Sequence, residues 1–123
     1  MQSDTLLLRQ IHPGFVQNGR VTSQAFRPTP KDKKKLSVYD DDMIDPEAAY
    51  RHYTEELKLS STGVMAVSVE ECNEIGLTPQ PDPEPFPEHA VIDFSGLGES
   101  AIKSKGKLLK NKAVARGWLY RDD

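Results

Sequence analysis

Residues that could take part in catalysis are concentrated in the first third of this 123-residue chain. Arg9, His12, Ser23 and Arg27 lie near the lysine-rich run 31–35. Histidine can serve as a general base, and arginine can clamp a phosphate or an oxyanion, so the group would suit a phosphorylated or nucleotide substrate. Because no motif sets their mutual distance, a capped turn followed by a solvated loop is the favoured interpretation.

Carboxylates form a second group at Asp40, Asp41, Asp42, Asp45 and Glu47. Such a cluster could hold Ca²⁺ or Mg²⁺, but the glycine-containing spacing of an EF-hand loop is missing. Asp45 has a better use as a helix cap, and the three histidines and one cysteine show no paired zinc-ligand spacing. We therefore predict no metal site and no cofactor.

The segment His89–Phe94 is typical of a strand and carries His89 and Asp93 on one face. Four residues at about 3.3 Å each place them about 13 Å apart, so they cannot pair with each other. Each could meet a group from a neighbouring strand. The favoured interpretation is polar residues near solvent at the ends of a strand.

Cations dominate the predicted helix 99–116, where Lys103, Lys107, Lys110 and Arg116 follow Glu99 without another acidic residue. The three lysines recur on one side of the helix and could contact phosphates or an acidic protein. No aromatic residues are interleaved with them, so stacking on single-stranded bases is not indicated. A solvated helix face is the first interpretation, a protein partner the second and nucleic acid the third.

Charge is divided unevenly between the two ends of the chain. Residues 1–98 have a net charge of −7 and residues 99–123 a net charge of +4, within a total of −3. A composition of 37% hydrophobic and 28% charged residues excludes collagen-like, coiled-coil and strongly disordered classes. No apolar run approaches the ~20 residues of a membrane span, and the N-terminus lacks a signal-peptide pattern. With the lone Cys72, this predicts a soluble, cytoplasmic protein that binds no membrane.

Local signals in the first half of the chain indicate the elements that must position these residues. Thr5–Ile11 is typical of a strand, and Asn18-Gly19 favours a small hairpin after it. A polar Lys/Pro loop over 27–35 precedes the alternating strand 36–39.

A helix is expected to begin at Asp45 and Pro46, which suit the N-cap and the first helical position. Tyr50, Tyr53 and Leu57 recur at helical spacing and should face the core.

In the second half, the apolar run Val64–Val67 predicts a strand covered on both faces, and Ser68 with Glu71 predicts a capping box. Proline at every second position over 79–87 forbids a central strand. We predict a stiff crossover there, about 28 Å long, that also protects a sheet edge.

The last predicted elements are the helix 99–116 and a short strand over 118–120. On that helix, Ile102, Gly106, Leu109 and Ala113 form a stripe widened by Leu108, and Gly106 should allow close approach to the sheet.

These elements predict one α+β domain over 1–123, with a mostly antiparallel or mixed sheet of about five strands and about three helices packed on it. No phosphate loop, nucleophile elbow or metalloprotease motif occurs in the sequence. The favoured function is therefore binding of a macromolecule, chiefly another protein, as an accessory, antitoxin-like or immunity-like component. The alternative is a small enzyme that uses Arg9, His12, Ser23 and Arg27. Nucleic-acid binding through the basic helix is the third hypothesis.

Overall fold

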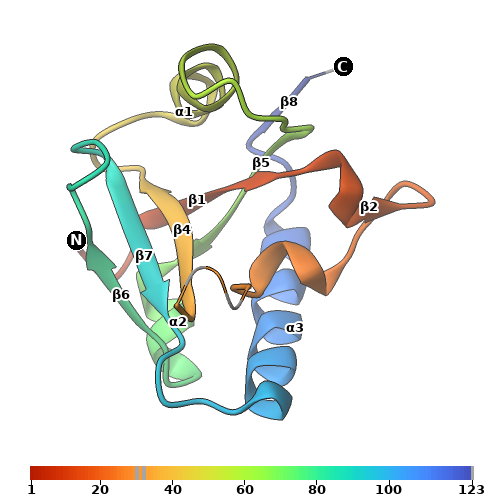
Figure 1. The fold of residues 1–123 in the computed structure, drawn as a ribbon, viewed down its shortest axis with the longest axis vertical. Coiled ribbons are helices and arrows are strands. Elements are labelled where there is room, and N and C mark those ends of the chain that lie inside the picture. The colour runs from red at the N-terminus through yellow and green to blue at the C-terminus, as the bar shows by residue number, and fades with distance from the viewer. Residues whose placement is uncertain (30, 32, 123) are drawn as a thin grey trace.

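A six-stranded antiparallel sheet forms the centre of the computed structural model, which describes residues 1–29, 31 and 33–122 (Figure 1). The strand order is β6-β7-β4-β1-β5-β8. These strands are β1 (Leu6–Ile11), β4 (Lys35–Asp40), β5 (Gly63–Ser68), β6 (Thr78–Pro81), β7 (His89–Asp93) and β8 (Tyr120–Arg121). A separate hairpin pairs β2 (Val16–Gln17) with β3 (Arg20–Val21).

Helices cover both faces of this sheet. One face carries α2 (Val69–Glu74), α3 (Glu99–Arg116) and the short 3-10 helices η1 (Pro13–Phe15) and η2 (Ser23–Phe26). The other face is covered by α1 (Pro46–Arg51) and the π-helical turn η4 (His52–Glu56) that continues it. In Figure 1, α1 lies at the top of the view and α3 at the lower right. The predicted α+β fold is confirmed, with six strands in the main sheet and three α-helices among the described residues.

Alternation along the strands separates two clusters of buried side chains. On β1, Leu7 and Ile11 join the larger cluster beneath α2 and α3, whereas Leu8 joins the smaller cluster beneath α1. On β4, Val38 belongs to the larger cluster and Tyr39 to the smaller one. Successive side chains on a strand point to opposite faces of the sheet, so neighbouring residues meet different helical layers.

The local capping signals act as predicted. The Asp45 carboxylate caps α1, with Pro46 in the first turn. Ser68 and Glu71 form the capping box of α2, with hydrogen bonds of 2.8 and 3.1 Å. The predicted small hairpin is also present, as β2 and β3.

Helix α3 has the predicted bounds and buries Gly106, Leu109 and Ala113. The close approach at Gly106 involves a different element from the one expected. A Cβ atom added there would lie 2.5 Å from Arg27 Cγ and 3.2 Å from the Phe26 carbonyl oxygen. Gly106 therefore lets α3 pack against the end of η2 and not, as predicted, against the sheet, although α3 does contact β5.

Two predicted core contacts are also wrong, since Leu57 is 38% and Leu108 is 44% exposed. Tyr50 and Tyr53 do pack against the smaller cluster, as predicted. The α-helix ends at Arg51 and continues as a π-helical turn, whose extra residue shifts the phase of the side chains that follow. This shift explains why Leu57 leaves the core.

The structure corrects the predicted crossover over 79–87. Thr78–Pro81 is the edge strand β6, and the chain then turns back into its neighbour β7. The Asp82 amide donates to the His89 carbonyl at 3.0 Å, so alternation directs the nitrogens of Pro79 and Pro81 away from β7. Proline has no N–H to offer there, which agrees with the predicted protection of a sheet edge.

The predicted Lys/Pro loop over 27–35 connects η2 to β4, and residues 30 and 32 lie outside the described residues. Lys34 has a positive φ of 62°. Its ammonium group donates to the Leu97 carbonyl at 2.8 Å, which ties this loop to the turn before α3.

Candidate functional site

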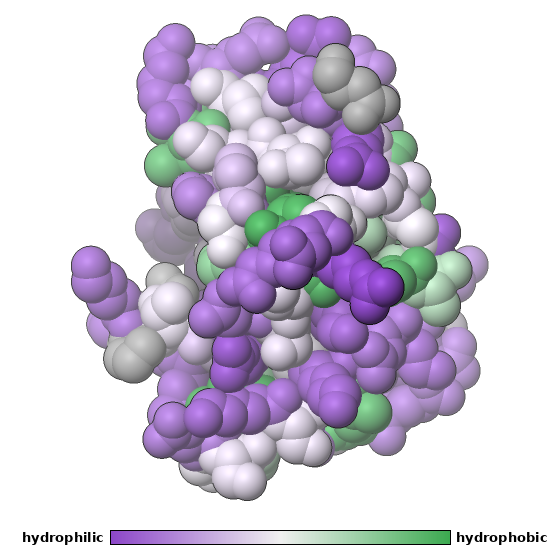
Figure 2. Space-filling model, turned by 90° about the vertical axis from the view of Figure 1, so that its right-hand side faces the viewer, coloured by the Kyte–Doolittle hydropathy of each residue, from purple (hydrophilic) through white to green (hydrophobic). Residues whose placement is uncertain are grey.

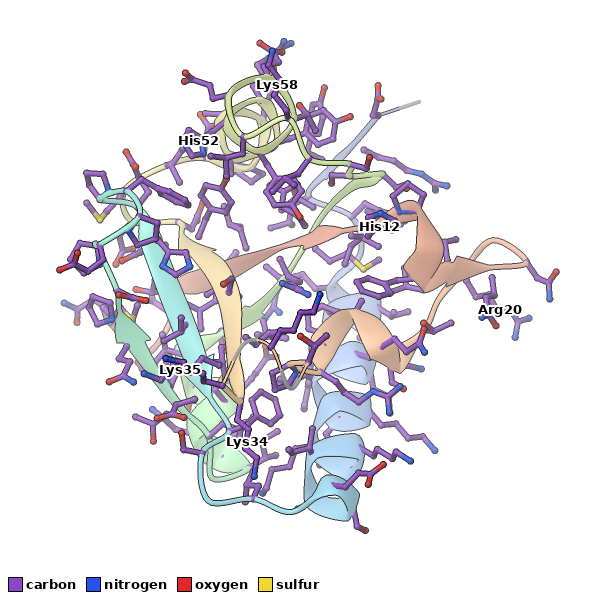
Figure 3. All side chains as sticks on the ribbon, viewed as in Figure 1. His12, Arg20, Lys34, Lys35, His52 and Lys58 are labelled. Atoms are coloured by element: carbon purple, nitrogen blue, oxygen red, sulfur yellow. The ribbon has the colours of Figure 1, made fainter. Side chains whose placement is uncertain are left out.

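The structure does not bring together the four residues predicted as a catalytic group. The Arg9 guanidinium is held by backbone carbonyls: Nε donates to Ala25 at 2.7 Å and an Nη to Ser37 at 3.0 Å. His12 Nδ1 accepts from the Gly14 amide at 2.8 Å and caps η1. Figure 3 shows His12 at the hairpin end of β1, on a different side of the molecule from Lys34 and Lys35.

Ser23 is the first residue of η2, and Arg27 follows its last residue. Arg27 lines a cavity of about 570 Å³, whereas Arg9 lines a different one and neither His12 nor Ser23 contributes to these two cavities. The convergent pocket that the enzyme hypothesis requires is therefore not formed by these residues.

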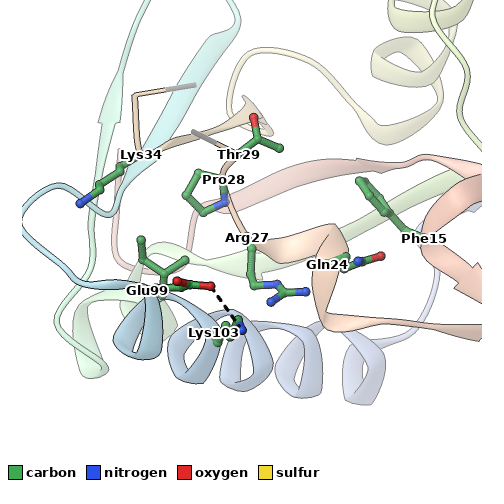
Figure 4. Close-up of a pocket in the computed structure, with 9 residues that line it drawn as sticks. Phe15, Gln24, Arg27, Pro28, Thr29, Lys34, Glu99 and Lys103 are labelled. Atoms are coloured by element: carbon green, nitrogen blue, oxygen red, sulfur yellow. Dashed lines mark ion pairs between the residues drawn. The ribbon is translucent and has the colours of Figure 1, made fainter. Parts of the chain in front are cut away.

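The Arg27 cavity lies between η2, the loop after it and the first turns of α3 (Figure 4). Its cations are Arg27, Lys34 and Lys103, and its acid is Glu99. Lys103 pairs with Glu99 at 3.4 Å, within the wall itself. Among the described residues, no buried side-chain nitrogen or oxygen in this wall lacks a partner. The described wall of this cavity thus offers no unpartnered buried polar group.

A second cavity, of about 490 Å³, lies on the α1 side of the sheet. Its polar residues are Arg9, Gln10, Ser37, Tyr39, Tyr53 and His89, and its apolar residues are Leu8, Val38, Leu57, Leu59, Pro85 and Phe86. We call it the Gln10 cavity. Its volume lies within the range of about 300–1,000 Å³ that is usual for small-ligand sites.

The Gln10 cavity sits where β1 and β4 separate. The described pairs between these strands are Leu7 with Asp40 and Leu8 with Tyr39, while each strand continues to pair with its other neighbour. Beyond these pairs the side chain of Arg9 bridges the two strands through the Ser37 carbonyl. Gln10 lies two residues after Leu8 on β1, and Ser37 lies two residues before Tyr39 on β4. Residues two apart on a strand share a face, so Gln10 and Ser37 face each other across the separation.

Gln10 is only 6% exposed, and its amide is half satisfied. The Ser61 hydroxyl lies 2.7 Å from Gln10 Oε1 and 2.9 Å from the Gly63 carbonyl oxygen. A hydroxyl has one proton, so it donates to only one of these two oxygens. Gln10 Nε2 is then the one buried side-chain nitrogen or oxygen in the described part of the chain that has no partner. An unpartnered buried group costs about 1–3 kcal/mol, and such groups are uncommon in folded proteins.

Ser37 and His89 form a hydrogen-bonded pair in the same cavity. His89 Nδ1 lies 2.8 Å from the Asp82 carbonyl oxygen and 3.5 Å from the Asp82 carboxylate. A carbonyl oxygen only accepts, so Nδ1 carries the proton and the neutral ring has its lone pair on Nε2. Nε2 is 3.1 Å from Ser37 Oγ, and the serine hydroxyl therefore donates to the imidazole.

This geometry changes the interpretation of His89, whose side chain is only 11% exposed and meets a neighbouring strand. Asp93 does behave as an ordinary strand-end residue. Its carboxylate accepts hydrogen bonds from the Ser95 hydroxyl and amide, and these bonds lower the pKa of Asp93 below its usual 3.8.

Aromatic rings form one wall of the Gln10 cavity. Phe86 packs against Tyr39, His52 and His89, with ring centroids 5.1, 4.5 and 5.2 Å away. The Tyr39 hydroxyl lies 2.8 Å from His52 Nδ1. Burial, together with nearby Tyr53 and Glu88, raises the pKa of Tyr39 above its ordinary 10.0, so the phenol stays protonated. One hydrogen bond, between Tyr39 and His52, therefore joins two of these rings.

The predicted binding residues of α3 fall into two kinds. Arg116 donates to the Ala66 carbonyl at 2.9 Å and to the Glu71 carboxylate, which makes it an internal clamp. Lys103 and Lys107 are exposed, and Lys110 is half-buried. The hairpin side of the molecule is predominantly hydrophilic, with apolar residues in small separate areas (Figure 2). A protein or nucleic-acid partner for these lysines stays a prediction.

Two of the clustered carboxylates at the end of β4 bind groups within the chain. Asp40 accepts from the Asp42 amide at 2.9 Å, and Asp42 accepts from the Thr5 hydroxyl at 2.7 Å. In the part of the chain that is described, no group of three or more His, Cys, Asp or Glu side chains is placed to hold a metal ion.

Gln10, Ser37, Tyr39 and Tyr53 were not predicted from the sequence as members of one cavity. Two signals were present: Gln10, with Arg9, interrupts the apolar residues of its strand, and Ser37 and Tyr39 alternate with apolar neighbours. What brings them together is the placement of β4 between β1 and β7, which no local pattern reveals.

The chain matches no protein-family model, no curated protein and no solved structure. None of the described helices is both long and apolar enough to cross a membrane. Function must therefore be inferred from the geometry of the Gln10 cavity.

Proposed function

We propose that this protein binds a small organic ligand in the Gln10 cavity, and that the ligand joins a hydrogen-bond acceptor to an apolar group. The observation that carries the proposal is that Gln10, one of the residues that line this cavity, has a buried side-chain Nε2 with no hydrogen-bond partner in the protein. An N–H group needs an acceptor, and a carbonyl oxygen is the commonest neutral one. An acceptor atom of the ligand that reached this N–H would satisfy it.

The apolar part of the ligand has its own partners. Leu57 and Leu59 are 38% and 49% exposed while lining the cavity, and Phe86 adds a ring to the wall. Covering these side chains is favourable by about 25 cal/mol per Å² of apolar surface removed from water. A flat aromatic ring would also meet the face or edge of Phe86, which favours an aromatic ligand.

The charge of the ligand follows from the charges of the cavity. Arg9 is the cavity residue with a permanent charge, and its guanidinium is already bonded to two backbone carbonyls. A neutral ligand therefore fits better than an anion. Binding of another protein by the lysines of α3 is a separate hypothesis, because Lys103 and Lys107 lie outside the lining of the Gln10 cavity.

Acetophenone and ethylbenzene test the proposal as a matched pair, since they differ by one carbonyl oxygen. In a titration followed by ¹H–¹⁵N NMR, we expect acetophenone to bind about 3–10-fold more tightly, as one net hydrogen bond of about 0.5–1.5 kcal/mol implies. The side-chain amide signal of Gln10 should shift with acetophenone. That signal is assigned by its loss in Gln10→Leu.

Gln10→Leu should retain ethylbenzene binding and lose the preference for acetophenone. Gln17→Leu, an exposed glutamine on β2, is the matched control and should retain the preference. Equal affinities of the wild-type protein for both compounds, or shifts confined to the Arg27 cavity, would overturn the proposal.

A further inference from the structure

We infer that the Gln10 cavity also hydrolyses a small neutral aryl ester, with Ser37 as the nucleophile and His89 as the general base. The inference rests on the proposed function, because the ester carbonyl is the acceptor that Gln10 would bind.

Three groups have the order that an activated serine needs. Ser37 Oγ lies 3.1 Å from His89 Nε2, within reach for direct proton transfer. On the far side of the ring, Nδ1 donates to the Asp82 carbonyl at 2.8 Å, which fixes the tautomer that can accept a proton at Nε2. The Asp82 carboxylate, 3.5 Å from Nδ1, favours the imidazolium that forms during the reaction.

The backbone holds Ser37 in place on both sides. Ser37 pairs with Val91 in the ladder between β4 and β7, and its carbonyl accepts from Arg9 at 3.0 Å. Ser37 itself is exposed, so a substrate can reach its hydroxyl. Gln10 faces Ser37 across the separation of β1 and β4, and we assign its side-chain amide as the donor for the oxygen on which negative charge develops.

The reaction balances with water as the second substrate. Ser37 Oγ bonds to the ester carbonyl carbon while its proton passes to His89 Nε2, and the carbonyl oxygen takes up negative charge beside Gln10. The tetrahedral adduct breaks its bond to the aryloxy oxygen, which leaves as a phenol with the proton from His89. Water then gives a proton to His89 and attacks the acyl carbon. Ser37 Oγ departs with that proton, and a carboxylic acid is released.

The cavity wall that favours an aromatic ligand also favours an ester with an aryl group. Phe86 lies against His89, with ring centroids 5.2 Å apart, so a ring stacked on Phe86 places its attached oxygen near the imidazole. A phenol is also a good leaving group for a site with a single base. Charged esters are disfavoured because the cavity offers no uncommitted countercharge among its described contacts.

Two aromatic reagents test the inference on the full chain. Phenylmethanesulfonyl fluoride should sulfonylate Ser37, located by peptide mass mapping, and p-nitrophenyl acetate should be hydrolysed with an acyl adduct on Ser37. We expect Ser37→Ala to abolish both, and His89→Gln to slow both about 100-fold, the usual contribution of a general base. Ser104→Ala, an exposed serine on α3, is the matched control and should react like the wild type.

The outcomes separate the two proposals. If acetophenone binds but Ser37 is unlabelled and Ser37→Ala hydrolyses the ester like the wild type, the ester inference is overturned and ligand binding stands. If the protein binds acetophenone no more tightly than ethylbenzene, the proposed function fails, and the ester inference fails as well. If Ser37→Ala or His89→Gln fails to fold, peptide mapping of the labelled wild-type protein still shows whether Ser37 reacts.

Discussion

The guanidinium of Arg116 closes on the carboxylate of Glu71 with hydrogen bonds of 2.9 and 3.2 Å, which joins the last turn of α3 to the first turn of α2. Glu71 also accepts from the Ser68 amide at 2.8 Å, so one carboxylate both caps α2 and anchors α3. Burial by itself raises the pKa of Glu71, but the hydrogen bonds from Arg116 and Ser68 outweigh it and lower the pKa below the ordinary 4.5.

This pair should make the fold sensitive to acid. A carboxyl whose pKa is lower in the folded state stabilises the fold above its unfolded pKa, and that contribution is lost as the pH falls through the folded pKa. Glu71→Gln keeps a capping side chain but no charge. We expect it to lower the free energy of unfolding by about 1 kcal/mol at neutral pH, after allowance for solvent screening.

Urea denaturation at a series of pH values checks this expectation. The difference between Glu71→Gln and the wild type should disappear once the pH is well below 4.5. Glu70→Gln, an exposed neighbour on the same helix, is the control and should show little difference. A loss from Glu71→Gln that is the same at every pH would contradict the assigned cause.

Gly106→Ala should destabilise the protein although alanine favours helices by about 1 kcal/mol over glycine. The new Cβ atom would lie 2.5 Å from Arg27 Cγ, and overpacking of this kind costs about 1–3 kcal/mol. Thermal or urea unfolding measures the balance. Ser104→Ala, an exposed site on the same helix, should be neutral or slightly stabilising.

Removing the clash should rescue the variant in part. Arg27→Ala deletes the Cγ atom, so the double variant Gly106→Ala, Arg27→Ala should unfold at a higher urea concentration than additivity predicts. The Phe26 carbonyl, 3.2 Å from the same Cβ position, limits the rescue. Strict additivity of the two substitutions would show that α3 does not depend on this approach.

Pro79→Ala with Pro81→Ala should make the protein self-associate. Both prolines lie on the edge strand β6, and alanine would present two outward N–H groups to a second sheet edge. Sedimentation velocity over a range of concentrations detects the change. Pro83→Ala with Pro87→Ala alters prolines outside the strand and should leave the sedimentation coefficient unchanged. An unchanged coefficient for the first pair as well would mean that this edge is protected by other means.

Arg9→Lys should lower the free energy of unfolding by about 1–3 kcal/mol, the cost of leaving a buried polar group unpaired. The guanidinium bonds the Ala25 and Ser37 carbonyls at once, and a lysine ammonium on a flexible stem cannot reproduce that planar fork. Arg20→Lys on the exposed hairpin is the control. Equal stability of Arg9→Lys and the wild type in urea would remove Arg9 as the bridge between β1 and β4.

Local chemistry explains most of what the sequence predicts correctly. Asp45 before Pro46, and Ser68 three residues before Glu71, bind backbone amides of their own helix. Such caps need no distant partner, so their residue types alone indicate where a helix begins. The bounds of α3 follow in the same way from a glycine on either side of a helical stretch.

The candidate site could not be predicted in this way. Arg9 and Gln10 are adjacent in sequence, but alternation sends them to opposite faces of β1, where they meet different layers. Ser37 and His89 meet only because β7 lies next to β4, although 52 residues separate them. A contact between strands that are distant in sequence depends on the strand order of the sheet. The alternation of side chains along one strand does not reveal that order.

The most direct test of the account is a crystal structure of the protein with acetophenone. We predict electron density for the ligand in the Gln10 cavity, with its carbonyl oxygen within hydrogen-bond distance of Gln10 Nε2 and its ring against Phe86. Density for acetophenone in the Arg27 cavity alone, or a Gln10 amide satisfied by water while the cavity stays free of ligand, would contradict the central claim.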